Sequence, residues 1–219
     1  MKGIILYKSK YGSMKKYAEW ISEETGFPCI ETDKAQVEQL ADCDVVLLGG
    51  GIYSAGISGI YFLKRHIDEL KGKKIIVFCG GASDYDEETL KHIARLNFRD
   101  KLEGIPYFYC RGAWDYQTMN DIDKFLCRTL LDAVSRKDPE GYEPWEKALV
   151  EAGLERRDWT DKKYIQPIIA TNYGGGNCGV IHQCHVFEIF SDIRVLRKNS
   201  EDEVTDSKYV SCIEHYSMV

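Results

Sequence analysis

Short apolar runs alternate with longer stretches of helical periodicity over about the first 135 residues of this 219-residue chain. The runs are bounded by glycine or polar residues and are largely continuous in apolar character, as in strands covered on both faces. Between them, apolar residues recur every three or four positions, the spacing of an amphipathic helix. The pattern predicts strands at residues 3–7, 27–31, 44–49, 74–79 and 105–110, and helices at residues 15–25, 35–40, 60–70, 87–96 and 122–134.

This alternation predicts an α/β fold with a five-stranded parallel sheet, right-handed crossovers and helices on both faces. In such a sheet, ligands bind outside the carboxyl ends of the strands. The loops after the first, third, fourth and fifth predicted strands are all rich in glycine, serine or aromatic residues. All of them lie at that one edge, so the sequence predicts a ligand site there.

The loop after the first strand has the composition of a phosphate site. It reads Ser9-Lys10-Tyr11-Gly12-Ser13 and leads directly into a predicted helix. Free backbone N–H groups at the positive end of that helix, together with the serine hydroxyls, would bind an anion. The spacings of the P-loop and of the dinucleotide fingerprint are absent. The alternative interpretation is an ordinary strand-to-helix turn with a serine N-cap.

Residues 5–13, followed by a helix, resemble the start of a flavodoxin-like domain. More narrowly, they resemble the flavodoxin-domain group that includes menaquinone-dependent protoporphyrinogen oxidases. In flavodoxins this loop reads Ser/Thr-x-Thr-Gly-x-Thr and surrounds the phosphate of flavin mononucleotide (FMN). Ser9, Gly12 and Ser13 fit that frame, whereas Tyr11 and Met14 replace two hydroxyl residues. The resemblance implies the strand order 2-1-3-4-5 and a flavodoxin-like domain over residues 1–165.

The resemblance also implies an FMN site formed by the converging loops. The phosphate seat would consist of Ser9, Lys10, Tyr11, Gly12, Ser13 and the backbone N–H of Met14. The next two loops would bracket the isoalloxazine ring with Ile52, Tyr53, Ala55, Gly80, Gly81, Ala82, Ser83, Asp84 and Tyr85. Residues 111–116, including Trp114, resemble the equivalent stretch of the narrower group and would close the outer side of the ring. For the aromatic residues of these loops, the alternative role is to cover loop backbone.

Residues 136–141 have the turn composition of a boundary, and residues 142–153 read as another helix. From about residue 166 the resemblance ends, and residues 166–219 are predicted to be a C-terminal extension of unknown role, dispensable for flavin binding. It is expected to hold a loop at residues 172–177, strand-like sequence at residues 180–196 and an acidic loop at residues 200–207. Cys178, His182, Cys184 and His185 are metal-ligand types, but their spacing fits no standard zinc motif, so no metal site is predicted.

Composition narrows the function classes. A net charge of −6 and a pI near 5.5 argue against a general nucleic-acid binder. No apolar run reaches the roughly 18 residues of a membrane span, and no signal-peptide pattern is present, so a cytoplasmic protein is expected. The eight cysteines are spread singly, without a Cys-x-x-Cys pair, and are expected to be reduced thiols.

Two functional hypotheses follow. The first is an FMN-binding protein that acts in electron transfer or as an FMN-dependent oxidoreductase, with a redox partner protein or a small-molecule donor or acceptor. The narrower resemblance implies quinone-linked substrate oxidation as one form of it. An acid–base dyad or nucleophile triad cannot be picked from the sequence, as expected where a cofactor supplies the chemistry. The second is a flavodoxin-fold module that has lost FMN and serves protein contacts. Either could be a monomer or a homodimer.

Overall fold

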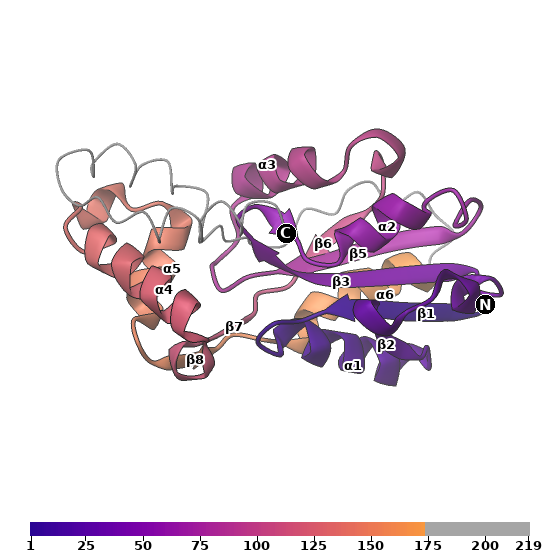
Figure 1. The fold of residues 1–219 in the computed structure, drawn as a ribbon, viewed down its shortest axis with the longest axis horizontal. Coiled ribbons are helices and arrows are strands. Elements are labelled where there is room, and N and C mark those ends of the chain that lie inside the picture. The colour runs from indigo at the N-terminus through magenta and orange to yellow at the C-terminus, as the bar shows by residue number, and fades with distance from the viewer. Residues whose placement is uncertain (174–219) are drawn as a thin grey trace.

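The computed structural model describes residues 1–173 as an α/β fold with a central sheet (Figure 1). The strands are β1 (Gly3–Lys8), β2 (Cys29–Glu31), β3 (Val45–Tyr53), β4 (Gly56–Ile57), β5 (Lys74–Gly80), β6 (Tyr107–Tyr109), β7 (Ala113–Asp115) and β8 (Arg156–Asp158). The α-helices are α1 (Ser13–Thr25), α2 (Ile60–His66), α3 (Glu87–Asn97), α4 (Asp121–Val134), α5 (Pro144–Ala152) and α6 (Gln166–Tyr173). The predictions for residues 174–219, including the Cys178–His185 patch, lie outside the described residues.

The central sheet has the order β2-β1-β3-β5-β6, and all four pairings along it are parallel. The short strand β4 pairs antiparallel with the end of β3 alone. Counting the parallel strands along the chain, this is the predicted flavodoxin-like order 2-1-3-4-5, which is confirmed. The sheet therefore presents the carboxyl ends of β1, β3 and β5 side by side.

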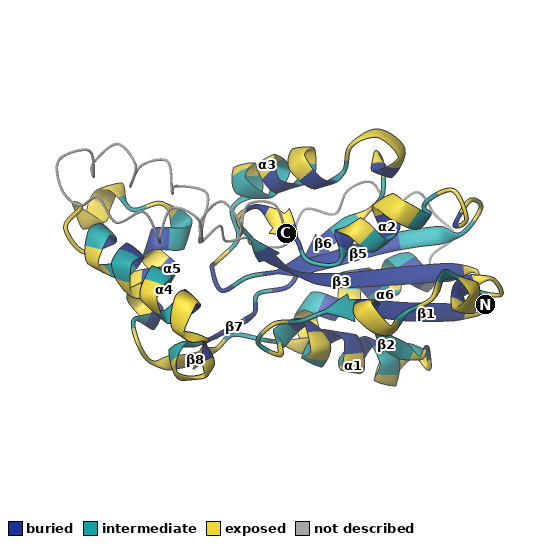
Figure 2. Ribbon diagram, in the orientation of Figure 1, coloured by how far each residue is buried: buried dark blue, intermediate teal, exposed yellow. Residues whose placement is uncertain are grey.

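Alternate residues of the strands enter two separate cores. Ile5, Leu47 and Ile76 are neighbours across the sheet and pack on the face covered by α1 and α6. Ile4 and Val46 face the opposite core, which α2 and α3 cover (Figure 1). Figure 2 shows the resulting layering, with buried central strands and helices exposed only on their outer sides. Both faces are helix-covered, as predicted.

The C-terminal part of β3 differs from the prediction. The sequence predicts that the strand ends at residue 49, the first of three consecutive glycines, yet β3 continues to Tyr53. These glycines stay extended because they pair with β1 and β5, and close packing leaves no room for side chains at two of them. A Cβ on Gly49 would lie 2.2 Å from the Phe78 ring, and one on Gly50 would lie 2.0 Å from the Ser58 carbonyl oxygen. Glycine within a strand is typical of such close approach.

The helices α4 and α5 build a lobe of their own beyond the end of the sheet (Figure 1). Their buried residues pack with Ala82, Trp114 and Met119 rather than with the strands of the central sheet. The sequence predicts residues 122–134 as one of the helices that cover the sheet. The helix itself is confirmed, but it packs in this lobe instead of on the sheet. The predicted helix at residues 35–40 is a 3-10 turn at Val37–Leu40.

The helix α6 takes the place on the sheet that was expected for residues 122–134. Ile165 and Ile168 are fully buried in the same core as α1, and the Lys74 ammonium donates a hydrogen bond to the Thr171 carbonyl. Packing thus continues across residue 165, where the sequence places the end of the domain. Two residues of the loop expected at residues 172–177, Asn172 and Tyr173, belong to this helix.

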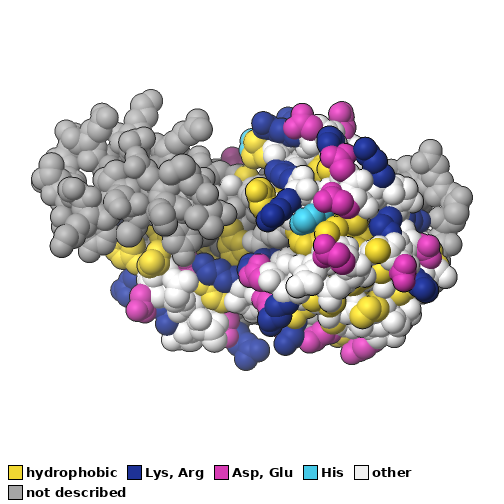
Figure 3. All heavy atoms as spheres, turned by 45° about the vertical axis from the view of Figure 1, so that its right-hand side comes forward, with side chains coloured by type: hydrophobic (Ala, Val, Ile, Leu, Met, Phe, Trp, Pro, Cys, Tyr) yellow, Lys and Arg dark blue, Asp and Glu magenta, His cyan; other side chains and the backbone are white. Residues whose placement is uncertain are grey.

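The surface carries charges of both signs, and the cysteines of residues 1–173 are not paired in disulfides. On the face drawn in Figure 3, basic and acidic side chains are interspersed rather than gathered by sign. Cysteines in the described part of the chain are free, namely Cys29, Cys43, Cys79, Cys110 and Cys127. Within residues 1–173, none of the helices is both long and apolar enough to cross a membrane.

Burial of Ile168 predicts that α6 is part of the folded unit. Ile168→Ala should lower the free energy of unfolding by about 2–5 kcal/mol, because it leaves a cavity beneath α6. The control is Val150→Ala, at a side chain that is 41% exposed, which should change stability by at most about 0.5 kcal/mol. Urea unfolding of both variants measures this, and equal small effects would show that α6 adds nothing to the core.

Candidate functional site

A cleft lies at the carboxyl ends of β1, β3 and β5, with α4 as its far wall. Its empty volume is about 670 Å³, including the part open to solvent. The lining residues that the sequence predicted are Ser9, Lys10, Tyr11, Ser13, Met14, Ile52, Tyr53, Gly80, Gly81, Ala82 and Trp114. Gly112 and Ala113 also line the cleft and belong to the segment 111–116 that the sequence predicted to close it. The sequence did not single out the remaining ones, which are Gly51, Met119, Asp123 and Cys127.

The loop between β1 and α1 makes a sharp turn at Gly12. Gly12 has φ 96°, a left-handed conformation that favours glycine, and a Cβ there would meet no atom within 4 Å. Conformation rather than lack of space therefore requires glycine. The Gly12 N–H donates to the Ser9 Oγ (3.1 Å), and α1 begins at Ser13 without a side-chain cap. The first N–H groups of α1 are thus left without intrahelical partners at the edge of the cleft.

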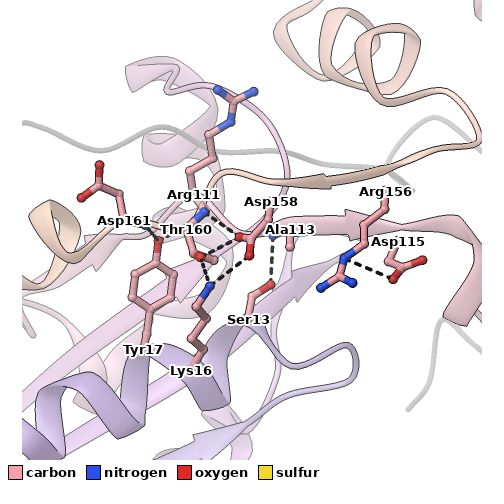
Figure 4. A network of polar contacts seen from close by, with 10 residues as sticks. All are labelled: Ser13, Lys16, Tyr17, Arg111, Ala113, Asp115, Arg156, Asp158, Thr160 and Asp161. Atoms are coloured by element: carbon pink, nitrogen blue, oxygen red, sulfur yellow. Dashed lines mark hydrogen bonds and ion pairs between the residues drawn. The ribbon is translucent and has the colours of Figure 1, made fainter.

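Polar contacts fix the first turns of α1 against the chain that follows β6 (Figure 4). The Ser13 Oγ accepts a hydrogen bond from the Ala113 N–H (2.9 Å). One turn on, the Lys16 Nζ contacts Asp158 Oδ2 (2.9 Å) and Thr160 Oγ1 (2.6 Å). The Tyr17 hydroxyl donates to the Arg111 carbonyl (2.6 Å). The start of α1 is therefore held in place from strands β7 and β8 as well as from β1.

The loop after β5 is held from beneath by a buried tyrosine. The Tyr109 hydroxyl donates to the Gly81 carbonyl (2.7 Å) and accepts from the Gly81 N–H (3.1 Å). Burial raises the pKa of Tyr109 well above its ordinary value, so the phenol stays neutral and keeps its proton to donate. A Cβ on Gly80 would lie 2.2 Å from the Cys110 carbonyl oxygen. Glycine is needed here to bring the backbone of β5 against that of β6.

The wall opposite the sheet comes from α4, which contributes Met119 just before its start, then Asp123 and Cys127. The buried positions of α4 are Asp123, Cys127, Leu130 and Val134, the stripe by which a helix packs on its neighbour. An aspartate inside that stripe is the signal by which the sequence could have identified Asp123 as a site residue. Such an acid is almost never fully buried unless it is paired.

Asp123 is indeed paired, with two residues of the loop across the cleft. Its Oδ2 lies 2.6 Å from the Lys10 Nζ and accepts a hydrogen bond from the Tyr11 hydroxyl. Burial, and next the bond to Asp123, raise the pKa of Tyr11. Burial, followed by the charge of Asp123, likewise raises the pKa of Tyr53. Both phenols therefore remain neutral at physiological pH.

Other predicted site residues lie away from the cleft lining, namely Gly12, Ala55, Ser83, Asp84 and Tyr85. Ala55 packs in the core under α2 and α3, and its carbonyl accepts from the buried Asn97 amide (2.6 Å). Asp84 pairs with the Arg111 Nη1 (2.6 Å). The Arg111 guanidinium group in turn lies over the Trp159 ring. Tyr85 packs against the core under α2 and α3. These residues shape the loops behind the cleft.

The fold and this cleft define an α/β protein with an open cleft at the carboxyl edge of a parallel sheet. The family described as the Flavodoxin domain matches residues 4–139. That match covers more than half of the chain, and the chain belongs to this family.

Several solved structures are similar to parts of the chain. The reduced flavodoxin of Megasphaera elsdenii is 20% identical, with 49% of this chain and 82% of that chain covered and a TM-score of 0.38. A flavoprotein of Lactobacillus acidophilus in complex with FMN is 18% identical, with 49% and 90% covered and a TM-score of 0.33. Oxidised flavodoxin 1 of Bacillus cereus is 18% identical, with 63% and 100% covered and a TM-score of 0.34. Curated proteins give no significant match.

The burial of Cys127 on α4 predicts that its contribution to stability depends on pH. Burial, and next the charge of Asp123, raise the pKa of the Cys127 thiol from 9.0 to about 12. Above the lower value the unfolded chain releases a proton that the folded chain keeps, so stability falls as pH rises. From about pH 8 to about pH 10, the stability advantage of the wild type over Cys127→Ala should shrink by roughly 1 kcal/mol. Urea unfolding at both pH values measures it, and an advantage independent of pH would contradict the burial of this thiol.

Proposed function

We propose that the cleft binds FMN and that the protein acts in electron transfer or as an FMN-dependent oxidoreductase. The observation that carries the proposal is the uncapped start of α1, which opens onto a cleft with apolar and aromatic walls. A phosphate would satisfy the free N–H groups of the helix, and a planar ring would cover the apolar walls. Membership of the flavodoxin-domain family supports the same ligand.

The donors at the loop fit a phosphate group. The oxygens of Ser9 and Ser13 each accept a backbone N–H, so both hydroxyl hydrogens remain to be donated. Free N–H groups at the start of α1 and the Lys10 ammonium add further donors. The positive end of the helix dipole favours an anion at the same point.

The walls fit the ring system. Met14, Ile52 and Trp114 are almost completely buried yet line the cleft, and Tyr53 adds a neutral aromatic ring. The backbone of Gly80, Gly81 and the segment 112–113 supplies polar groups for the rim of a heteroaromatic ring. When bound, FMN would supply the redox chemistry, and this chain would bind it, orient it and keep water from its covered face.

The finer form of the proposal is quinone-linked oxidation of a porphyrin-like substrate. It is supported by the sequence resemblance of residues 111–116 to the equivalent stretch of the narrower group. Trp114, which belongs to these residues, lines the cleft. The alternative to a porphyrin-like electron donor is a redox partner protein. We also propose that the protein acts in the cytoplasm. Anaerobic protoporphyrinogen oxidation by the FMN-loaded protein, with and without menaquinone, separates the two. Quinone-dependent turnover supports the finer form, and its absence leaves electron transfer.

The competing function is a flavodoxin-fold module without FMN that serves protein contacts. The Lys10–Asp123 ion pair favours it, because the pair already occupies the one cationic side chain that lines the cleft within the described residues. Flavin titration of the flavin-free protein decides between the two. Saturable one-to-one binding with a yellow product supports the FMN function, and no binding supports the module.

The phosphate seat predicts how two loop substitutions act. Gly12→Val should weaken FMN most, because a β-branched residue cannot readily hold the φ of 96°. Ser9→Ala should weaken FMN by roughly 1–3 kcal/mol, as for a hydrogen bond to a charged group. Both should affect riboflavin less, since it has no phosphate. Flavin fluorescence titration with each ligand measures this.

The matched control is Ser135→Ala, which removes an exposed hydroxyl at the end of α4 and should leave both affinities unchanged. Equal losses of FMN and riboflavin in the loop variants would show that this loop is not the phosphate seat.

A further inference from the structure

One ion pair dominates the electrostatics of the cleft. Among the described residues that line it, Lys10 is the only Lys or Arg and Asp123 the only carboxylate. Their Nζ and Oδ2 atoms lie 2.6 Å apart, with 7% of the Asp123 side chain and 32% of the Lys10 side chain exposed. The charge that an anionic ligand would meet therefore depends on how far the Asp123 carboxylate neutralises the Lys10 ammonium.

The carboxylate is the fixed member of this pair. Asp123 stands in the first turn of α4, where its N–H donates to the N-cap Asn120 Oδ1 (2.9 Å). Its side chain shares the buried face of α4 with Cys127 and Leu130. Lys10 instead has a long side chain on a loop, with its ammonium also within 5.7 Å of the Tyr53 ring centre. Lys10 can redirect its charge, whereas Asp123 cannot leave the cleft.

The charge of Asp123 is felt on several sides of the cleft. It raises the pKa of Tyr11 from the loop and of Tyr53 from β3, in each case after the larger effect of burial. It also raises the pKa of Cys127 one turn along α4. A phosphate dianion at the start of α1 would enter the same field, where like charges repel.

We propose that Asp123 is a specificity-determining residue that lowers the preference of the cleft for phosphate-bearing flavin, by holding Lys10 and by repelling the phosphate. The proposal rests on the FMN function proposed above. It assigns the selectivity between FMN and riboflavin to a balance between the donors of the loop and one buried acid on α4. Neutralising that acid frees Lys10 for the phosphate and removes the repulsion, so both effects act in the same direction.

The test is fluorescence titration of flavin-free protein with FMN and riboflavin, for the wild type, Asp123→Asn, Lys10→Met and the double variant. Asp123→Asn keeps an oxygen that can accept the Tyr11 hydroxyl and should raise the FMN-over-riboflavin preference roughly tenfold. Lys10→Met should lower that preference by about tenfold or more, because it leaves an unpaired carboxylate facing the phosphate. The double variant should return close to the wild-type preference.

Two controls separate charge from loop geometry. Tyr11→Phe removes the other partner of Asp123 without changing charge, and it should not raise the FMN-over-riboflavin preference. Raising the ionic strength from about 0.1 M to 1 M should reduce the gain in Asp123→Asn, because the cleft is open to solvent on one side.

The outcomes are distinguishable. If the wild type binds neither flavin, the FMN function and this inference both fall. If the wild type binds FMN but Asp123→Asn lowers the FMN-over-riboflavin ratio or leaves it unchanged, Asp123 only holds the loop and this inference alone falls. Should Asp123→Asn fail to fold, Lys10→Met decides: an unchanged FMN-over-riboflavin ratio overturns the inference.

Discussion

The turn at Gly12 is the constraint on which the rest of the site depends. Its left-handed φ of 96° lets β1 pass into α1 within a few residues. The helix therefore starts at the carboxyl edge of the sheet with its N–H groups uncapped. Ser13 then fixes this start to the chain after β6 through the Ala113 N–H. Without that turn, the donors of the loop and the walls of the cleft would not face one ligand.

The second determinant is the lobe built by α4 and α5. Because the chain from β7 to β8 leaves the central sheet before α6 returns to cover it, the cleft gains a wall that the sheet alone could not provide. That wall places Met119, Asp123 and Cys127 opposite the loop after β1. The sheet and α1 thus supply the side with the proposed phosphate seat, and α4 supplies the opposing carboxylate.

The sequence predicts the sheet well because its signal is local. Continuous apolar runs identify buried strands, and the glycine-rich loops mark the edge at which they end. The end of β3 could not be predicted, since the glycines at positions 49–51 read as a loop until the Phe78 ring and the Ser58 carbonyl are seen against them. Most of the cleft residues in the loops after β1, β3 and β5 could be predicted because glycine-rich loops follow these strands directly in the sequence.

The α4 wall could not be located from sequence in the same way. Periodicity shows that residues 122–134 form a helix, but it does not say which neighbour the apolar stripe packs against. Ile165, just before α6, and Ile168 within it pack on the sheet, whereas the buried residues of α4 pack in a separate lobe. An aspartate within the apolar stripe of α4 indicates a paired acid, but only the packing of α4 shows that Asp123 faces the cleft.

We propose that FMN occupies this cleft with its phosphate at the start of α1. Amide chemical-shift mapping of the isotope-labelled, flavin-free protein tests it most directly. Addition of FMN should shift the amides of residues 10–14, 80–82 and 112–114. Riboflavin should shift the last two groups while leaving residues 10–14 largely unmoved. Shifts confined to other surfaces, or identical shifts of residues 10–14 with both ligands, would contradict the assignment.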